Sequence, residues 1–190
     1  MSGQVLKDSL VEEARAKELL YFHSKGVWLK FPKSHARQQT GRPPVTARWV
    51  DVNKGDEQNP NYRSRLVARQ IKAHDKSGET YFASAPPLEA LRTVLSLAMT
   101  RIGDHQPIWD PLSASRAQLS FVDAKRAYFN AKIGESDAPT FVCLPTEGPE
   151  HETMCGRLLR HMYGTRGAAG GWQKEYSTML ISLGFQQGVS

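Results

Sequence analysis

Two strand-like segments at residues 45–53 and 63–72 constrain the fold most strongly. The residues between them are rich in Gly, Asp, Asn and Pro, which is the composition of a long turn. Two such segments joined by a turn predict a β-hairpin. Because side chains alternate along a strand with period two, Arg63, Arg65 and Arg69 fall on one face of the second strand.

Positive charge is concentrated around this hairpin. The 190-residue chain has a formal net charge of +6, and residues 30–72 alone hold ten Lys or Arg residues against three acidic residues, a net of +7. Such a concentration favours a polyanionic partner such as nucleic acid. It also suits a solvated edge strand, where positive charge discourages aggregation. The sequence leaves both interpretations open.

Helical and extended patterns precede the hairpin. Ser9 and Glu12 form a capping-box pattern ahead of spaced apolar residues, which predicts a helix over about residues 9–24. An extended segment over residues 28–32 is expected next. The Pro, Gly and Gln content of residues 33–44 predicts a loop that leads into the hairpin.

Two further helices are predicted after the hairpin. Pro87 lies in the first turn of a helix whose apolar residues follow a 3.6-residue period, and we expect this helix to pack against a sheet. Near the C-terminus, Gly167, Gly170 and Gly171 precede an amphipathic helix that Gly184 ends. The fold class predicted from these elements is α+β, an antiparallel sheet with packed helices.

A carboxylate ends the apolar, strand-like residues 119–123. Asp123 would stand on a rigid strand beside an open turn, where metal chemistry is often carried out. Tyr128 and Phe129 follow closely and could pack beneath the sugar of a nucleotide. Simpler interpretations stay open, because Asp commonly caps a turn and adjacent aromatic residues often belong to a core.

The cysteines and histidines do not suggest a metal centre. Cys143, His151, Cys155 and His161 lack the close C-x2-C spacing of structural zinc sites, so buried cysteines and surface histidines are expected. Two cysteines form no disulfide framework, and no apolar run approaches the roughly 20 residues that cross a bilayer. We therefore expect an intracellular protein without a membrane partner, in the cytoplasm or the nucleus.

Five segments carry a further pattern because of their order along the chain. They are residues 18–32, which end Gly-Val-Trp-Leu-Lys-Phe-Pro; Arg48-Trp-Val-Asp-Val with Ser64-Arg-Leu-Val-Ala-Arg; Glu79-Thr-Tyr-Phe-Ala-Ser-Ala-Pro with Leu91-Arg-Thr-Val-Leu-Ser-Leu-Ala; Gln118 to Asn130, which includes Asp123; and Tyr163-Gly-Thr-Arg-Gly-Ala-Ala-Gly-Gly-Trp. In this order they resemble the reverse transcriptase of Ty1/copia-type retrotransposons. The second segment is similar to the fingers hairpin of that family, and the fourth is similar to its first palm motif.

This resemblance implies a fold and an activity. The fold would be a partial right-hand polymerase in a single partial domain over residues 1–190. Its fingers would comprise about residues 1–104 and 131–162, and its palm portions about residues 105–130 and 163–190. The intact enzyme would be an RNA-directed DNA polymerase that adds deoxynucleotides to a primer by a two-metal mechanism.

The resemblance also implies site residues and partners. Asp123 would be the catalytic residue and a ligand of Mg²⁺ or Mn²⁺. Arg65, Arg69, Tyr128 and Phe129 would bind the incoming nucleotide. Arg63, Lys72, Arg166 and Gly167 would contact nucleic acid. The implied partners are an RNA or DNA template with its primer, deoxynucleoside triphosphates, and the remainder of a retrotransposon polyprotein with its integrase and RNase H.

The chain departs from the family in two respects. Gly167 stands where the family has Gln, and Ala169 where it has Pro. No Asp-Asp pair occurs in the sequence, so one carboxylate is available where two-metal chemistry requires several. We therefore expect a polymerase fragment without activity of its own. The alternative is a catalytically inactive nucleic-acid-binding remnant that uses the basic hairpin.

Overall fold

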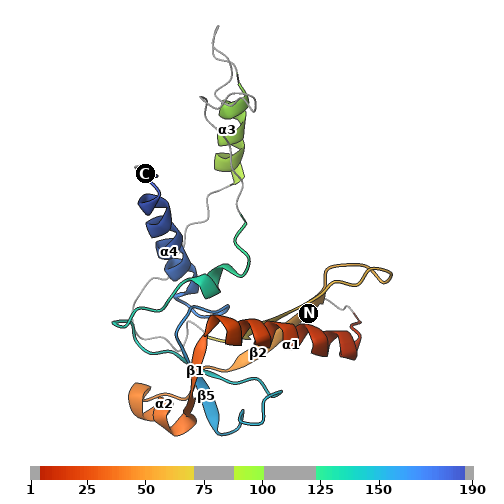
Figure 1. The fold of residues 1–190 in the computed structure, drawn as a ribbon, viewed down its shortest axis with the longest axis vertical. Helices are drawn as coiled ribbons and strands as arrows, with labels where there is room; N and C mark the ends of the chain where they lie inside the picture. Colours follow the sequence, from red (N-terminus) through yellow and green to blue (C-terminus); the bar gives the residue numbers. More distant parts are fainter. Residues whose placement is uncertain (1–4, 71–87, 101–122, 187–190) are drawn as a thin grey trace. The chain divides into compact units, whose positions relative to one another are not determined.

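A computed structural model describes residues 5–70, 88–100 and 123–186 of the chain (Figure 1). The chain divides into two compact units, one of residues 1–82 and 126–190 and the other of residues 83–125. The described residues form helices and small antiparallel sheets, so the predicted α+β class is confirmed. Among these residues, no helix is long and apolar enough to cross a membrane.

The larger sheet has three strands, β1 (Trp28–Pro32), β4 (Phe141–Cys143) and β5 (Met154–Leu158). Their order is β1-β5-β4, and both pairings are antiparallel. The extended segment predicted at residues 28–32 is therefore confirmed. Gly156 lies in the middle of the central strand, and a Cβ atom there would stand 2.9 Å from the Trp28 ring. A glycine is needed because this ring packs directly on the strand.

The second sheet is the predicted hairpin, with β2 (Ala47–Asn53) paired to β3 (Tyr62–Ala68). Its turn is held by side chains that bond backbone N–H groups: Asn53 Oδ1 accepts from Gly55 and Asn61, and Asp56 accepts from two further residues. Short polar side chains of this kind stabilise turns through such local bonds. The turn residues that suggested a hairpin therefore also build it.

Helix α1 (Asp8–Lys25) confirms the helix predicted over residues 9–24. Its N-terminal cap is Lys7, and no side chain bonds the free backbone N–H groups there. The capping box predicted from Ser9 and Glu12 is therefore wrong. The helix ends at Gly26, which adopts a left-handed conformation with φ of +57°.

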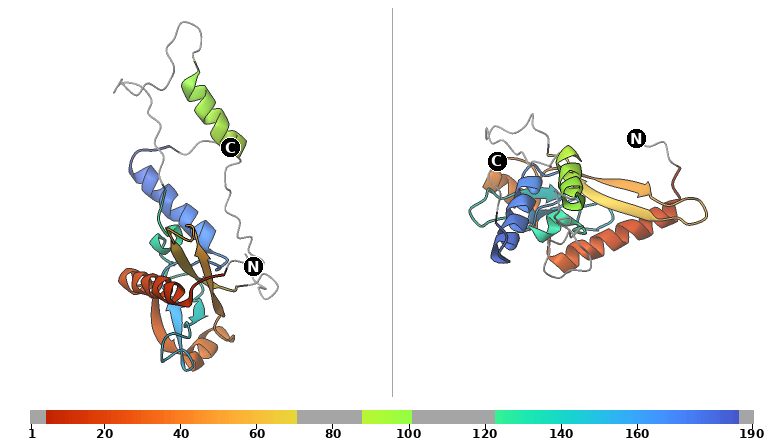
Figure 2. Two further views of the ribbon diagram at one scale, coloured as in Figure 1. Left: turned by 90° about the vertical axis from the view of Figure 1, so that its right-hand side faces the viewer. Right: turned by 90° about the horizontal axis from the view of Figure 1, so that it is seen from above.

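The core lies where α1 meets both sheets. Figure 2 shows α1 running along the β2–β3 hairpin. Its buried face carries Ala14, Glu18 and Phe22, which are four residues apart and so lie above one another on the helix. The Phe22 ring packs 4.8 Å from that of Trp28 and 4.6 Å from that of Phe129. Apolar burial of this kind is the main favourable contribution to folding.

The loop predicted over residues 33–44 is wrong for residues Lys33–Thr40, which form helix α2. Ala36 is fully buried against Phe31, Phe141 and Cys155, so one face of this short helix covers the three-stranded sheet. Gly41, with φ of +66°, ends the helix. The Gly and Pro residues that suggested a loop, Gly41, Pro43 and Pro44, all follow the C-terminal end of the helix, and tertiary burial of Ala36 stabilises the helix before them.

The remaining elements of the described residues are helix α3 (Leu88–Met99), the 3₁₀ turn η2 (Ala127–Asn130) and helix α4 (Ala168–Ser182). The two predicted helices are confirmed, although α4 begins before Gly170 and includes it. Leu91 and Val94 of α3 are about half exposed, so its packing against a sheet stays a prediction. Of the strand predicted at residues 119–123, only Asp123 lies among the described residues, outside any helix or strand.

Candidate functional site

The outer face of the β2–β3 hairpin presents a group of arginines. Alternation along β3 buries Ser64, Leu66 and Ala68 and turns the other side chains outward. Arg63 and Arg69 are exposed there, as is Arg48 on β2, the cross-strand partner of Val67. Arg48, Arg63 and Arg69, termed the outer arginine face, have no ion pair within the described part of the chain. Their guanidinium groups are therefore open to an anionic partner.

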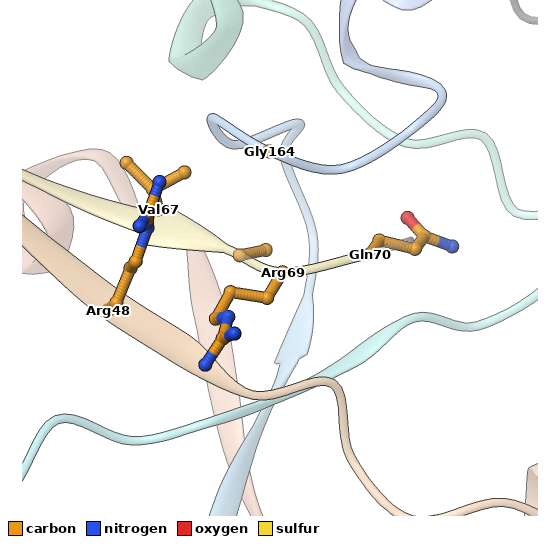
Figure 3. A pocket seen from close by; sticks show the side chains of 6 residues that line it. Arg48, Val67, Arg69, Gln70 and Gly164 are labelled. Carbon is orange, nitrogen blue, oxygen red and sulfur yellow. The ribbon is translucent and has the colours of Figure 1, made fainter. Parts of the chain in front are cut away.

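A shallow hollow of about 270 Å³ lies beside this face (Figure 3). It is lined by Arg48, Val67, Ala68, Arg69, Gln70 and Gly164. In the figure, Arg69 and Gln70 extend from the chain just after β3, and Gly164 approaches from a separate segment. The hollow thus combines two guanidinium groups, one amide side chain and a glycine backbone, all of which can donate or accept hydrogen bonds.

Gly164 holds the far wall of the hollow close to β3. Its neighbour Tyr163 accepts a hydrogen bond from the Ala68 N–H at 2.8 Å, and Gly164 itself accepts one from the Gln70 N–H at 3.3 Å. A Cβ atom at this position would stand 1.9 Å from the Ala68 carbonyl oxygen, and φ is +80°. Both the space and the backbone conformation therefore require glycine.

Arg65 lies on the same strand but belongs to a different group. Its Nη1 atom is 3.3 Å from Oε2 of Glu18, whose side chain is fully buried in α1. Oε2 also accepts a hydrogen bond from Nε of Arg126 at 2.8 Å, and Nη2 of Arg126 lies 2.8 Å from it in an ion pair. Glu18, Arg65 and Arg126, with Tyr21 and Tyr163 beside them, are termed the Glu18 cluster. One carboxylate here pairs with two guanidinium groups and offsets one of their two positive charges, in a setting where an unpaired buried charge would be costly.

Aromatic rings complete the Glu18 cluster. The Arg126 guanidinium lies 4.1 Å from the centroid of the Tyr21 ring, and that of Arg65 lies 5.7 Å from the Tyr163 ring. Burial raises the pKa of Tyr163, and the nearby Arg65 partly opposes this. Arg126 adopts φ of +53°, the one positive φ outside glycine in the described residues. Its hydrogen bonds and ring contact compensate a conformation that such residues rarely adopt.

The two aromatic residues predicted to bind a nucleotide are placed differently. Phe129 is fully buried and packs against Phe22 and Tyr163, so it offers no surface to a nucleotide in this structure and has a packing role. Tyr128 is partly exposed, and its ring meets that of Tyr163 edge to face at 5.0 Å. Only Tyr128 of this pair is accessible.

The predicted metal ligand stands by itself. Asp123 is exposed and belongs to the unit of residues 83–125. No group of three or more His, Cys, Asp and Glu side chains that could hold a metal ion occurs in the part of the chain that the structure describes. One exposed carboxylate supplies too few ligands to hold Mg²⁺ or Mn²⁺ by itself. The role of Asp123 stays a prediction.

The remaining residues predicted to contact nucleic acid lie near α4 or outside the described residues. The backbone N–H of Arg166 donates to Oε1 of Gln70 at 2.9 Å, which ties this segment to the hollow. Gly167 is the N-terminal cap residue of α4. Lys72 lies outside the described residues. The segment that contains Tyr163 to Trp172 is thus brought beside the hairpin end by Gly164 and Arg166.

Two features of this region carry a signal in the sequence that was not used to predict them. Arg48 is paired with Val67 and therefore lies on the same sheet face as the arginines of β3. A cross-strand register for the predicted hairpin would have placed it there. Glu18 lies at helical spacing between Ala14 and Phe22 on an otherwise apolar stripe. A charged residue in such a stripe indicates a buried ion pair, although its partners at positions 65 and 126 could not be read from it.

Comparison with family models, with curated proteins and with solved structures finds no match to this chain.

Proposed function

We propose that this chain is a nucleic-acid-binding part of an RNA-directed DNA polymerase of the Ty1/copia type. In this proposal, the outer arginine face contacts the phosphates of the template or primer strand. The proposal is supported by five sequence segments in the family's order and by the exposure of Arg48, Arg63 and Arg69 without ion pairs in the described residues. The exposed arginines are the single observation that carries it.

The chemistry of these side chains suits phosphate. A guanidinium group is planar, stays charged at any physiological pH and donates two parallel hydrogen bonds to a phosphate. Arg48 and Arg69 also flank the hollow of about 270 Å³, in which Gln70 adds a polar side chain. Phosphate contacts of this kind supply affinity that does not depend on base sequence and that weakens with salt. This is the binding expected of a polymerase that accepts any template.

Arg65 is not included in the proposed phosphate contacts. Its guanidinium is already shared between Glu18 and the Ser64 carbonyl, and its side chain is 30% exposed. Binding a phosphate would have to compete with a buried carboxylate. The proposed phosphate contacts are therefore those of Arg48, Arg63 and Arg69, and Arg65 has a structural role through its ion pair with Glu18.

Binding to a labelled primer–template, followed by fluorescence anisotropy, tests the proposal. A variant with Arg48→Gln, Arg63→Gln and Arg69→Gln should bind at least about 10-fold more weakly. The reason is that each arginine that neutralises a phosphate releases counterions, and this release supplies much of the affinity. A control with Arg37→Gln, Lys132→Gln and Lys174→Gln removes the same charge from other exposed positions. Equal affinities of the two variants would refute a specific role for the hairpin.

An extension assay tests the catalytic side of the proposal. The chain alone should add no nucleotide to the primer in the presence of Mg²⁺ or Mn²⁺, because its sequence holds no Asp-Asp pair to join Asp123 in binding two metals. Metal-dependent extension by the purified chain would contradict this expectation. The same two assays address the alternative of an inactive nucleic-acid-binding remnant, which is favoured by the open arginines and needs no metal.

A further inference from the structure

The two cysteines of the chain lie directly opposite each other on neighbouring strands. Cys143 ends β4, and its register partner on β5 is Cys155. Residues paired in this way point to the same face of a sheet. That face carries Phe31 and Phe141 and is covered by Ala36 of α2. Both thiols are free, with Cys155 buried and Cys143 partly exposed.

The backbone hydrogen bonds show that this is a non-hydrogen-bonded pair. The Cys143 N–H donates to the Val45 carbonyl at 2.8 Å, away from β5. Three positions along the ladder, Thr140 and Leu158 form a hydrogen-bonded pair, since the Leu158 N–H donates to the Thr140 carbonyl at 2.9 Å. The two kinds of pair alternate along antiparallel strands, so Val142 and Gly156 form the bonded pair and the cysteines do not.

This kind of pair brings the two Cα atoms close enough for a disulfide. Opposite residues in a non-hydrogen-bonded pair have Cα atoms about 4.5 Å apart, and disulfides span Cα separations of about 4.4–6.8 Å. In the reduced protein the thiols turn apart, because Cys155 Sγ lies 3.4 Å from the Phe31 carbonyl oxygen and Cys143 Sγ lies 3.8 Å from that of Pro44. Rotation of the two side chains, without a shift of strand register, is needed to join them.

We propose that Cys143 and Cys155 form a reversible cross-strand disulfide when the protein meets an oxidising low-molecular-weight disulfide such as glutathione disulfide. The proposal is independent of the proposed function. Closing this ring would tie β4 to β5 and restrain the connection between them, which carries Glu147. Since Glu147 accepts a hydrogen bond from Arg15 Nη1 at 2.9 Å, the restraint would reach α1.

The reaction balances as two thiol–disulfide exchanges. The Cys143 thiolate attacks one sulfur of glutathione disulfide, forms a mixed disulfide and releases glutathione thiolate. Cys155 then loses its proton to solvent and attacks Cys143 Sγ, which releases the second glutathione. Two protein thiols are oxidised and one glutathione disulfide is reduced. Burial raises the pKa of Cys155, so this second step should be the slower one and should accelerate as the pH rises.

Mass spectrometry of the folded 190-residue chain after incubation with glutathione disulfide tests the inference. The expected product is an intramolecular Cys143–Cys155 disulfide, which dithiothreitol reverses. Cys155→Ser should instead accumulate the mixed disulfide of Cys143 with glutathione. Cys143→Ser should remain unmodified while folded, since Cys155 is buried. The rate of disulfide formation in the unchanged chain should rise between neutral pH and about pH 9, toward the titration of a buried thiol.

Several results would overturn the inference. These are a disulfide that forms only in denaturant, a disulfide between two copies of the chain, and glutathione attached first to Cys155. A measurement on the unchanged chain guards against misfolded variants: N-ethylmaleimide, followed by peptide mapping, should label Cys143 before Cys155 in the native protein. Equal labelling rates of the two residues would also contradict the assignment.

Discussion

Arg63 and Arg65 lie two residues apart on the same strand, yet they belong to two different regions. Arg63 is exposed on the outer arginine face and has no ion pair in the described residues. Arg65 reaches round to α1, where it shares the buried carboxylate of Glu18 with Arg126. The difference lies in the partner, because only Arg65 is within reach of a buried charge. Two arginines on the same face of one strand can therefore differ in role: one stabilises the fold, and the other remains available for a ligand.

The largest effect should follow from removing the charge at the centre of the Glu18 cluster. Glu18→Gln keeps the shape of the side chain but leaves Arg126 and Arg65 without a neutralising partner. Breaking a buried ion pair in this way costs about 3–5 kcal/mol, so the free energy of unfolding measured in urea should fall by that amount. Glu13→Gln, on the exposed side of α1, is the matched control and should leave the urea midpoint unchanged. If the two variants had similar urea midpoints, a stabilising role of the Glu18 cluster would be contradicted.

Gly164, at the border between the two regions, should give the next largest effect. Gly164→Ala would place a methyl group against the Ala68 carbonyl in a left-handed conformation, and we expect a loss of about 2–3 kcal/mol. Gly170→Ala is the control, because no atom lies within 4 Å of a Cβ there and the residue is helical. It should stabilise the chain by about 0.5–1 kcal/mol in thermal or urea unfolding. The two substitutions should therefore change the free energy of unfolding in opposite directions. Equal changes would contradict the close packing of Gly164 on β3.

The two arginines of β3 should differ in a direct comparison. Arg65→Gln removes a hydrogen bond to a buried carboxylate and should cost about 1–2 kcal/mol in urea unfolding. Arg63→Gln should change stability by no more than about 0.5 kcal/mol, as expected for an exposed side chain. In nucleic-acid binding the order should reverse, with Arg63→Gln the more harmful. If both variants lost stability and binding to the same extent, the assignment of Arg63 and Arg65 to different roles would be contradicted.

A smaller effect is expected from the ion pair between α1 and β2. Burial tends to raise the pKa of Asp51, but hydrogen bonds from Arg15 and Ser64 outweigh it and hold the pKa below its usual 3.8. The stabilisation from this depressed pKa is complete above the unfolded pKa and is lost as the pH falls through the folded one, hence below about pH 4. Its size is about 1 kcal/mol or less, because the pair is partly exposed.

The acid dependence can be isolated with Asp51→Asn. Urea unfolding of the unchanged chain and of this variant, measured from pH 6 down to pH 2, should converge as the pH falls below about 4. A constant difference between the two chains over the whole range would show that the ionised carboxylate of Asp51 does not contribute.

Local patterns predicted the local structure well. The hairpin followed from turn residues and period-two alternation, and α1, α3 and α4 followed from helical spacing. Helix α2 was missed because it depends on the burial of Ala36 against residues more than 100 positions later, which no local pattern reports. The same limit applies to the Glu18 cluster, whose ion pairs join residues 47 and 108 positions apart.

The candidate site was predictable only in part. Arg63 and Arg69 were placed on one exposed face by alternation alone, and the structure adds Arg48 through the register of β2. Alternation could not separate Arg65 from them, since the position of α1 decides its partner. The hollow at Gly164 needed a contact between segments that are nearly 100 residues apart, so its walls could not be assembled from the sequence.

The salt dependence of nucleic-acid binding tests the central claim most directly. The slope of log K against log salt reports the number of phosphates contacted, at about 0.9 per phosphate for a duplex. If Arg48, Arg63 and Arg69 each contact a phosphate, changing all three to Gln should reduce the magnitude of the slope by about 2.7, that is, three contacts at about 0.9 each. The control triple at Arg37, Lys132 and Lys174 should keep the slope of the unchanged chain. A slope unaffected by the hairpin changes, or reduced equally by both triples, would contradict the proposal that the outer arginine face binds nucleic acid.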